Sequence, residues 1–136
     1  MYPAIICMDV DDTLAIQGIP HPGPVQLYRI IELRNQGNVV GVCGNFINLF
    51  KYYPDWWKIF SFYGPAELTG TSLLAHHQFK HFDLIRRAKA LKANRYVMVG
   101  NRAGDPKVRP GSQDDLQAKL AKWEFISETD FAQGRF

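Results

Sequence analysis

The chain has 136 residues, of which 46% are hydrophobic and 21% charged, and its formal net charge is +3. A chain of this length can bury an apolar core in one globular domain, and its composition argues against a disordered protein. The apolar runs are too short to span a membrane, and the small positive charge is spread along the sequence, so membrane proteins and dedicated nucleic-acid binders are disfavoured.

The first half of the chain predicts two buried strands and two helices. Residues 4–8 form an apolar run typical of a central parallel strand, and they lead into Asp9-Val10-Asp11-Asp12-Thr13. Residues 14–23 contain two glycines and two prolines and predict a loop or flap. A helix is expected between Pro24 and Gly37, with an inward face made of Val25, Leu27, Ile30, Ile31 and Leu33. A second strand at 39–43 precedes a short helix that ends at about residue 51.

The second half of the chain predicts three further strands and two further helices. Residues 58–63 are expected to form a strand that stops at Gly64-Pro65. A long helix follows at about 81–91, with an inward face made of Phe82, Ile85, Ala88 and Leu91. Residues 96–99 predict a strand that leads into Gly100-Asn101. A helix at about 113–121 and a strand at 124–127 end the predicted order.

Strands that alternate with helices predict a Rossmann-like three-layer α/β/α fold with a mostly parallel sheet of about five strands. We expect a single domain over residues 1–136 without a separate cap domain. The carboxyl ends of parallel strands share one edge of the sheet, which is where functional residues gather. Asp9 and Asp11, residues 43–45, and residues 101–105 should therefore lie at one edge.

The two cysteines, Cys7 and Cys43, each lie in a predicted buried strand. Buried cysteines in apolar runs are typical of reduced thiols in a cytosolic protein. The N-terminus lacks the basic region of a signal peptide. We therefore expect a cytoplasmic protein.

The most informative pattern is Asp9-x-Asp11-x-Thr13, directly after the first strand. Two carboxylates this close repel each other, so a hard divalent cation such as Mg²⁺ is the natural partner. With a metal present, one carboxylate can attack phosphorus while the other exchanges protons with the leaving group. An acidic turn that only caps a strand is the structural alternative.

Four motifs, in their order and spacing, resemble those of the haloacid dehalogenase-like superfamily. The segment Asp9-Val10-Asp11-Asp12-Thr13-Leu14 resembles the first motif, and Val40-Gly41-Val42-Cys43-Gly44-Asn45 resembles the second. Lys80, before the fourth strand, resembles the lysine of the third motif, and Met98-Val99-Gly100-Asn101-Arg102-Ala103-Gly104-Asp105 resembles the fourth. The resemblance covers the chain from Ile5 to the strand at 124–127.

The resemblance implies a small, capless, magnesium-dependent phosphomonoesterase that works through an aspartyl-phosphate on Asp9. Asp11 would be the general acid and then the general base, and Lys80 would neutralise phosphate charge. The implied phosphate-binding residues are Thr13, Cys43, Gly44, Asn45 and Lys80. The implied ligands of Mg²⁺ are Asp9, Asp11, Asn101 and Asp105. The substrate would be a phosphorylated small molecule.

Two residues depart from the superfamily pattern. Cys43 stands where a Thr or Ser hydroxyl usually holds the phosphate, and a thiol is a weaker donor. Asn101 stands where an aspartate usually binds the metal, so we expect a weaker metal site. These departures keep open an alternative, a catalytically weak or inactive binding module for a phosphorylated ligand or a protein partner. A cysteine nucleophile is disfavoured, because the Cys-x5-Arg pattern would need arginine where Leu49 stands.

The segment 46–63 is rich in aromatic residues. Four of them, Tyr52, Tyr53, Trp56 and Trp57, could form an exposed patch that binds a leaving group or a second subunit, as in a homo-oligomer. Core packing is the favoured expectation for most of these rings. His77 and His81 are spaced i, i+4, but no cysteine or acidic pair accompanies them at the spacing of a zinc site, so exposed histidines are expected.

Overall fold

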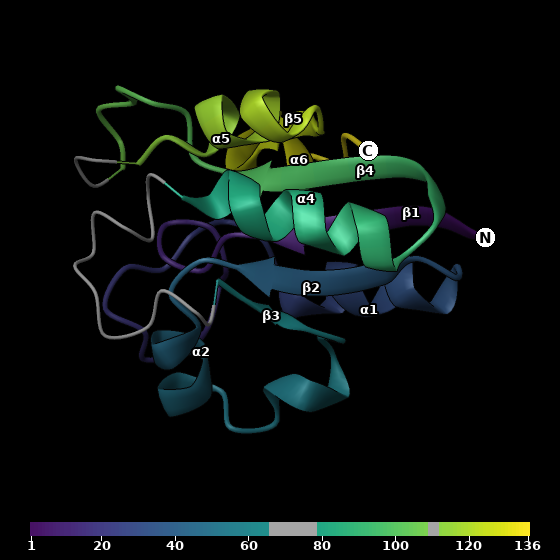
Figure 1. Cartoon of the computed structure of the whole chain (residues 1–136). Helices are drawn as coiled ribbons and strands as arrows, with labels where there is room; N and C mark the ends of the chain where they lie inside the picture. The colour runs from purple at the N-terminus through teal and green to yellow at the C-terminus, as the bar shows by residue number, and fades with distance from the viewer. Residues whose placement is uncertain (66–78, 109–111) are drawn as a thin grey trace.

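The computed structural model describes residues 1–65, 79–108 and 112–136. Its centre is a parallel sheet of five strands in the order β3-β2-β1-β4-β5. The strands are β1 (Tyr2–Met8), β2 (Val39–Cys43), β3 (Tyr63–Gly64), β4 (Ala93–Gly100) and β5 (Glu124–Ser127). Figure 1 shows β1, β2 and β4 side by side, with their carboxyl ends on the left of the view.

Helices cover both faces of this sheet, which confirms the predicted three-layer α/β/α fold. They are α1 (Leu27–Asn35), α2 (Phe46–Tyr52), a 3-10 helix η1 (Trp56–Lys58), α4 (Lys80–Ala90), α5 (Asp114–Ala121) and α6 (Glu128–Ala132). In Figure 1, α4 and α5 lie in front of the sheet and α1 lies behind it. No helix in the described ranges has the length and apolar character needed to cross a bilayer.

The core is divided by the sheet because successive side chains of a strand point to opposite faces. Along β1, Ala4, Ile6 and Met8 pack on the side of α1 and α6, whereas Ile5 and Cys7 pack on the side of α4 and α5. All five side chains are buried. A strand that is buried on both faces has to be apolar throughout, which explains the continuous run in the sequence.

The strand predicted at 58–63 is wrong over most of its length. Chain pairing with β2 begins only at Ser61, whose N–H donates to the Val40 carbonyl oxygen, and η1 occupies the start of the predicted range. The rings of Phe50, Trp56 and Tyr63 pack together, with centroid separations of 4.5–5.3 Å. This ring packing folds the segment back on itself, so period-2 alternation does not describe it.

The prediction of an exposed aromatic patch is wrong for three of its four residues. Tyr52, Tyr53 and Trp56 are half-buried and pack against the larger core cluster, and only Trp57 is exposed. Core packing, the favoured expectation, holds for most of the rings.

The inward face predicted for the helix before β4 is partly wrong. Ala88 and Leu91 pack against the core as predicted, but Phe82 does not. The buried side chains of α4 include Lys80, Asp83 and Leu84, whereas Phe82 is 61% exposed and stacks on Phe79. Lys80 turns inward because its ionic partners Asp9 and Asp114 lie there. Asp83 is also buried, and it pairs with Arg86 and Arg87 of its own helix. In α1, Ile30 and Leu33 are buried as predicted, but Ile31 is 44% exposed. His76 and His77 lie outside the described residues.

Candidate active site

Asp9 lies at the carboxyl end of β1, in the centre of the sheet. Its backbone N–H donates to the Val99 carbonyl oxygen, which continues the pairing of β1 with β4. The next turn is closed by hydrogen bonds from the N–H groups of Thr13 and Leu14 to the Val10 carbonyl oxygen. Asp12 has a left-handed φ of 59°, which bends the chain away from the strand. The Asp9 carboxylate is thereby held at the sheet edge, with only a small exposed fraction.

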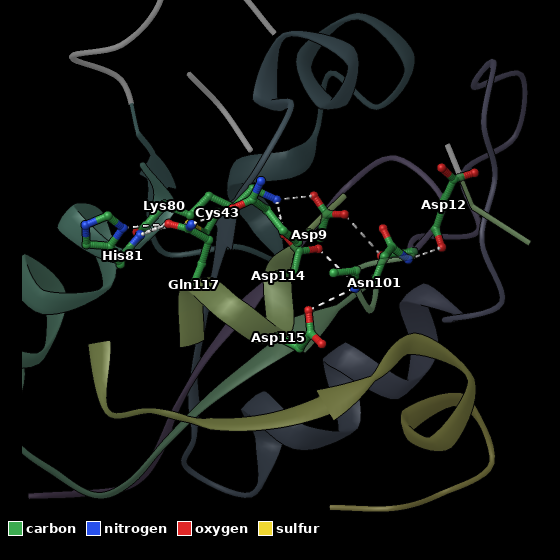
Figure 2. A network of polar contacts seen from close by, with 12 residues as sticks. Asp9, Asp12, Cys43, Lys80, His81, Asn101, Asp114, Asp115 and Gln117 are labelled. Atoms are coloured by element: carbon green, nitrogen blue, oxygen red, sulfur yellow. Dashed lines mark hydrogen bonds and ion pairs between the residues drawn. The ribbon is translucent and has the colours of Figure 1, made fainter. Parts of the chain in front are cut away.

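Lys80 connects Asp9 to a second carboxylate, that of Asp114. The Lys80 Nζ lies 2.9 Å from Asp9 Oδ1 and 2.6 Å from Asp114 Oδ1, and all three side chains are buried. Asp114 begins α5, and its other oxygen accepts a hydrogen bond from the Asn101 N–H at 2.9 Å. Figure 2 shows Lys80, Asp9 and Asp114 in contact, with Asn101 next to them. The ends of β1 and β4 and the starts of α4 and α5 thus meet at one ion triad.

The triad carries one uncompensated negative charge when all three groups are ionised. Burial would lower the pKa of Lys80, but Asp114 and Asp9 outweigh that effect and raise it, so the ammonium stays charged. Burial and the neighbouring Asp114 raise the pKa of Asp9, although Lys80 acts in the opposite direction. A proton on Asp9 or a bound cation is needed to compensate the remaining charge.

Two glycines make the close packing around the triad possible. A Cβ atom at Gly44 would lie 2.3 Å from Asp9 Oδ1, and a Cβ atom at Gly100 would lie 2.3 Å from Asp114 Oδ2. Both distances are far below van der Waals contact. Gly44 follows β2 and Gly100 ends β4. Because these two residues have no side chain, the carboxylates of Asp9 and Asp114 can lie directly against the backbone there.

Asp11 is held by the beginning of α2. Its two carboxylate oxygens accept hydrogen bonds from the amides of Asn45 and Asn48, each at 3.0 Å. Asn45 also caps α2, since its side-chain oxygen accepts from the Asn48 N–H. The two amides therefore fix the position of the Asp11 carboxylate at the start of α2.

Asn101 follows β4 and contacts both the triad and the turn after β1. Its side-chain Nδ2 donates to the Asp12 carbonyl oxygen at 3.0 Å. Its Oδ1 is buried and has no hydrogen-bond partner within the described ranges. A buried acceptor without a partner is costly, so this oxygen is suited to a ligand that supplies positive charge.

The residues at this edge fit Mg²⁺ through a mixed set of oxygens. Among the residues that the structure describes, no group of three or more His, Cys, Asp or Glu side chains is placed to hold a metal. Mg²⁺, however, is usually bound through one or two carboxylates with neutral oxygens and water. Asp9 Oδ2, which accepts a long 3.4 Å hydrogen bond from Thr13, and the unpartnered Asn101 Oδ1 supply one donor of each kind.

Three further residues were predicted to belong to the site, namely Thr13, Cys43 and Asp105, and each has its own surroundings. Thr13 is buried beneath Asp9, and its hydroxyl is the donor of that 3.4 Å bond. Cys43 is fully buried, and its thiol lies 3.9 Å from the Lys80 carbonyl oxygen, on the α4 side of the sheet. Burial raises the pKa of the Cys43 thiol, with Cys7 acting in the same direction, which argues against a thiolate. Asp105 lies in the loop after β4, where its carboxylate accepts from the Lys107 N–H.

Sequence reasoning missed two buried acidic residues at this edge, Asp114 and Glu128. Asp114 was interpreted only as part of a helix start, and Glu128 follows the last strand. The available signal was positional, because both residues lie next to a strand end or a helix start on the functional edge of the sheet.

Comparison of the chain with protein-family models, with curated proteins and with solved structures gave no match.

Proposed function

We propose that the protein is a magnesium-dependent phosphomonoesterase of the haloacid dehalogenase-like type, with Asp9 as the nucleophile. The observation that carries the proposal is the buried contact of Asp9 with Lys80, two residues that lie 71 positions apart in the chain. A buried carboxylate held by an ammonium at a parallel-sheet edge is the arrangement that attack on an anionic phosphate ester requires.

In the proposed reaction, an Asp9 oxygen attacks phosphorus and the bond to the leaving-group oxygen breaks. Asp11 gives its proton to that oxygen. Water then attacks the aspartyl-phosphate, Asp11 accepts the proton of the water, and the Asp9–phosphorus bond breaks to release phosphate. Lys80 keeps Asp9 in place and lowers the repulsion between the carboxylate and the phosphate.

The bound Mg²⁺ would neutralise phosphate oxygens and so favour the attack. Asp9 Oδ2 and Asn101 Oδ1 would hold it, together with the Asp11 backbone carbonyl that the superfamily resemblance implies. Asp105 remains a proposed ligand, acting directly or through water. For the phosphate, the backbone N–H of Asn45 is the proposed donor. The prediction that the Gly44 N–H binds the phosphate is wrong, because this N–H donates to the Gly64 carbonyl oxygen at 3.0 Å.

We propose a phosphorylated small molecule as the substrate and the cytoplasm as the location. The small net charge of +3 suits an anionic small molecule. Both cysteines are free and buried, which supports a reducing compartment.

The proposal is tested with a generic aryl phosphate in the presence and absence of Mg²⁺. We expect Mg²⁺-dependent hydrolysis that Asp9→Asn reduces by about a thousandfold or more, since the amide cannot form the phosphoenzyme. The matched control is Asp55→Asn, whose carboxylate is on the surface, with 61% of the side chain exposed. Equal activity of Asp9→Asn and wild type would contradict the proposal.

A non-catalytic binding module that keeps the same site is the second candidate. It is favoured by Cys43, which is buried against α4, and by the neutral Asn101 at the implied metal position. This candidate predicts that phosphate or a phosphorylated ligand binds in calorimetry although no hydrolysis is detected. Absence of Mg²⁺ binding at millimolar metal would favour it over the phosphatase.

A further inference from the structure

The strand β3 is very short and lies at the edge of the sheet. It consists of two residues, Tyr63 and Gly64, and in the described part of the chain it pairs with β2 alone. Figure 1 shows it beyond β2, on the side away from β1. Strands in globular proteins usually have about five or six residues, so β3 gains little from its own backbone pairing. A strand this short needs contacts with another element to stay in place.

The carbonyl groups around β3 point alternately to β2 and to the open edge. The Phe62 carbonyl oxygen accepts from the Val42 N–H at 2.9 Å. The Gly64 carbonyl oxygen accepts from the Gly44 N–H at 3.0 Å. The carbonyl oxygen of Tyr63, which stands between these two acceptors, therefore points away from β2. A neighbouring strand would normally supply the donor for it, and an edge strand lacks that neighbour.

Arg87 of α4 supplies the missing donor. Its Nη2 donates to the Tyr63 carbonyl oxygen at 2.8 Å. The guanidinium carbon lies 4.5 Å from the centre of the Phe62 ring, and Nε lies 3.7 Å from Asp83 Oδ1. Only 22% of the Arg87 side chain is exposed. The guanidinium thus binds the outer edge of β3, through a charged hydrogen bond that is stronger than a neutral one.

β3 in turn fixes Gly44, which lies against the proposed nucleophile. The Gly44 N–H donates to the Gly64 carbonyl oxygen, and a Cβ atom on Gly44 would lie 2.3 Å from Asp9 Oδ1. Gly64 is also packed against α4, since a Cβ atom there would lie 2.5 Å from Asp83 Oδ2. A shift of β3 would therefore move the backbone that packs directly against Asp9.

We propose that Arg87 is a positioning residue of the candidate active site, which keeps Gly44 in contact with Asp9 by holding the edge strand β3 in place. Arg87 influences the reaction only through the backbone of β3 and of the residue after β2. Its effect on catalysis rests on the proposed function, whereas its effect on the hydrogen bond of the Gly44 N–H does not.

Amide hydrogen exchange, followed by NMR, tests the structural part of this inference without metal or substrate. Arg87→Met keeps an apolar side chain but cannot donate to the Tyr63 carbonyl oxygen. Asp83 keeps its ion pair with Arg86 in this variant, so its carboxylate is not left without a charged partner. We expect the Gly44 N–H to exchange at least about tenfold faster than in wild type, because β3 separates from β2 more often.

The Asp9 N–H is the internal reference for this measurement. It donates to the Val99 carbonyl oxygen of β4, so it reports on the sheet away from β3, and its exchange should change much less. The matched control is Arg86→Met, which removes a more exposed arginine bound to the same carboxylate and should leave the Gly44 N–H unchanged. Unchanged Gly44 exchange in Arg87→Met, or equal acceleration at Gly44 and Asp9, would overturn the inference.

The catalytic part is tested with an aryl phosphate and Mg²⁺. Arg87→Met should lower kcat by about tenfold with little change in KM, because a displaced nucleophile impairs the attack more than the binding. Arg87→Lys keeps a charged donor for the Tyr63 carbonyl oxygen and should recover most of this loss. Arg86→Met should have the kcat of wild type. A loss in Arg87→Lys as large as that in Arg87→Met would overturn the inference.

A double-mutant cycle with Gly44→Ala shows whether Arg87 acts through Gly44. In Gly44→Ala the new Cβ already displaces the Asp9 carboxylate, so adding Arg87→Met should lower kcat/KM by less than about threefold more. Fully additive losses, or wild-type kcat in Arg87→Met, would overturn the inference. If none of the proteins hydrolyses the ester but the Gly44 N–H responds as expected, the proposed function fails and the hold of Arg87 on Gly44 is supported.

Discussion

Asp114 has a different partner for each of its oxygens. Oδ1 accepts from Lys80 and Oδ2 accepts from the Asn101 N–H. Asp114→Asn leaves one acceptor oxygen for two donors, and its NH₂ group must face one of them. We expect a loss of about 2 kcal/mol in the free energy of unfolding and of about 100-fold in phosphatase activity. Denaturant unfolding and steady-state kinetics measure the two effects.

The neighbouring Asp115→Asn is the control for this prediction. Asp115 lies in the same first turn of α5 and accepts from the Ala103 N–H, but it does not belong to the triad. An amide oxygen can keep that hydrogen bond, so the substitution removes the same charge from the helix start with little cost. Equal activity losses in the two variants would show that Asp114 acts only through its charge at the start of α5.

Asp83 gives the protein a predicted pH dependence of stability. Burial raises the pKa of this carboxyl to about 6, although Arg87 and the Cys43 thiol act in the opposite direction. The folded protein therefore binds a proton at Asp83 more readily than the unfolded chain does between about pH 4 and pH 6. Stability should fall as the pH rises through this window, by up to about 3 kcal/mol.

Asp83→Asn removes this titration and is the test of it. The free energy of unfolding of wild type, measured relative to that of Asp83→Asn, should decrease from pH 4 to pH 6 and change little at higher pH. The neutral amide cannot form the ion pairs that Asp83 makes with Arg86 and Arg87, which adds a constant difference at high pH. The slope is therefore the diagnostic quantity. A relative stability that rises between pH 4 and pH 6 would contradict the raised pKa.

At the scale of elements, the sequence predicted best those segments that are buried on both faces. The apolar run after residue 3 forms β1, and the second strand lies at Val39–Cys43, the range predicted for it. The errors arose where tertiary partners override periodicity. In α4, Lys80 turns inward to its ionic partners Asp9 and Asp114, and Phe82 stays outside. These two partners come from distant elements, so no local pattern reveals them.

The contact between the end of β2 and the end of β1 leads to a prediction about Gly44. In Gly44→Ala the new Cβ would lie 2.3 Å from Asp9 Oδ1, so the carboxylate has to move away from Lys80. A displacement of this size at a nucleophile costs about 100-fold in kcat/KM. Kinetics on the folded variant, with its fold checked by circular dichroism, measure the effect.

Gly134→Ala is the matched glycine variant for this experiment. Gly134 lies beyond α6 with a φ of 102°, and a Cβ there meets no atom within 4 Å. The substitution should cost about 1–2 kcal/mol in backbone strain but leave kcat/KM unchanged. A Gly44→Ala variant that keeps wild-type kcat/KM would show that Asp9 tolerates the shift.

At the scale of the whole molecule, the candidate site forms because the ends of neighbouring strands lie side by side. The strand ends that carry Asp9 and Asn101 could be predicted to meet, because parallel strands share an edge. Lys80 was selected by resemblance to a family, and the structure brings it to Asp9. Asp114 and Glu128 join the same edge only through the packing of α5 and the pairing of Gly100 with Ser127. Neither the packing of α5 nor the pairing of these two strands can be predicted from the local sequence, so both residues were missed.

The uncompensated buried charge of the triad lowers the free energy of unfolding of the whole protein. Ionised Asp9 is buried next to Asp114, and one Lys80 compensates only one of the two carboxylates. Such a group lowers stability at neutral pH, because its pKa is raised in the folded state. A residue that is needed for function is therefore expected to reduce the stability of the metal-free protein.

Asp9→Asn tests this relation between charge, metal and stability. Without metal, the variant should melt at the same temperature as wild type or higher, because the uncompensated charge is gone. Mg²⁺ at ten times its dissociation constant should stabilise wild type by about 1.4 kcal/mol, a rise in melting temperature of about 3–5 °C, and should leave Asp9→Asn unchanged. Asp55→Asn, with its exposed side chain, should respond to Mg²⁺ as wild type does. A metal-free Asp9→Asn variant that melts well below wild type would mean that the triad stabilises the fold, and a full Mg²⁺ response in that variant would place the metal away from Asp9.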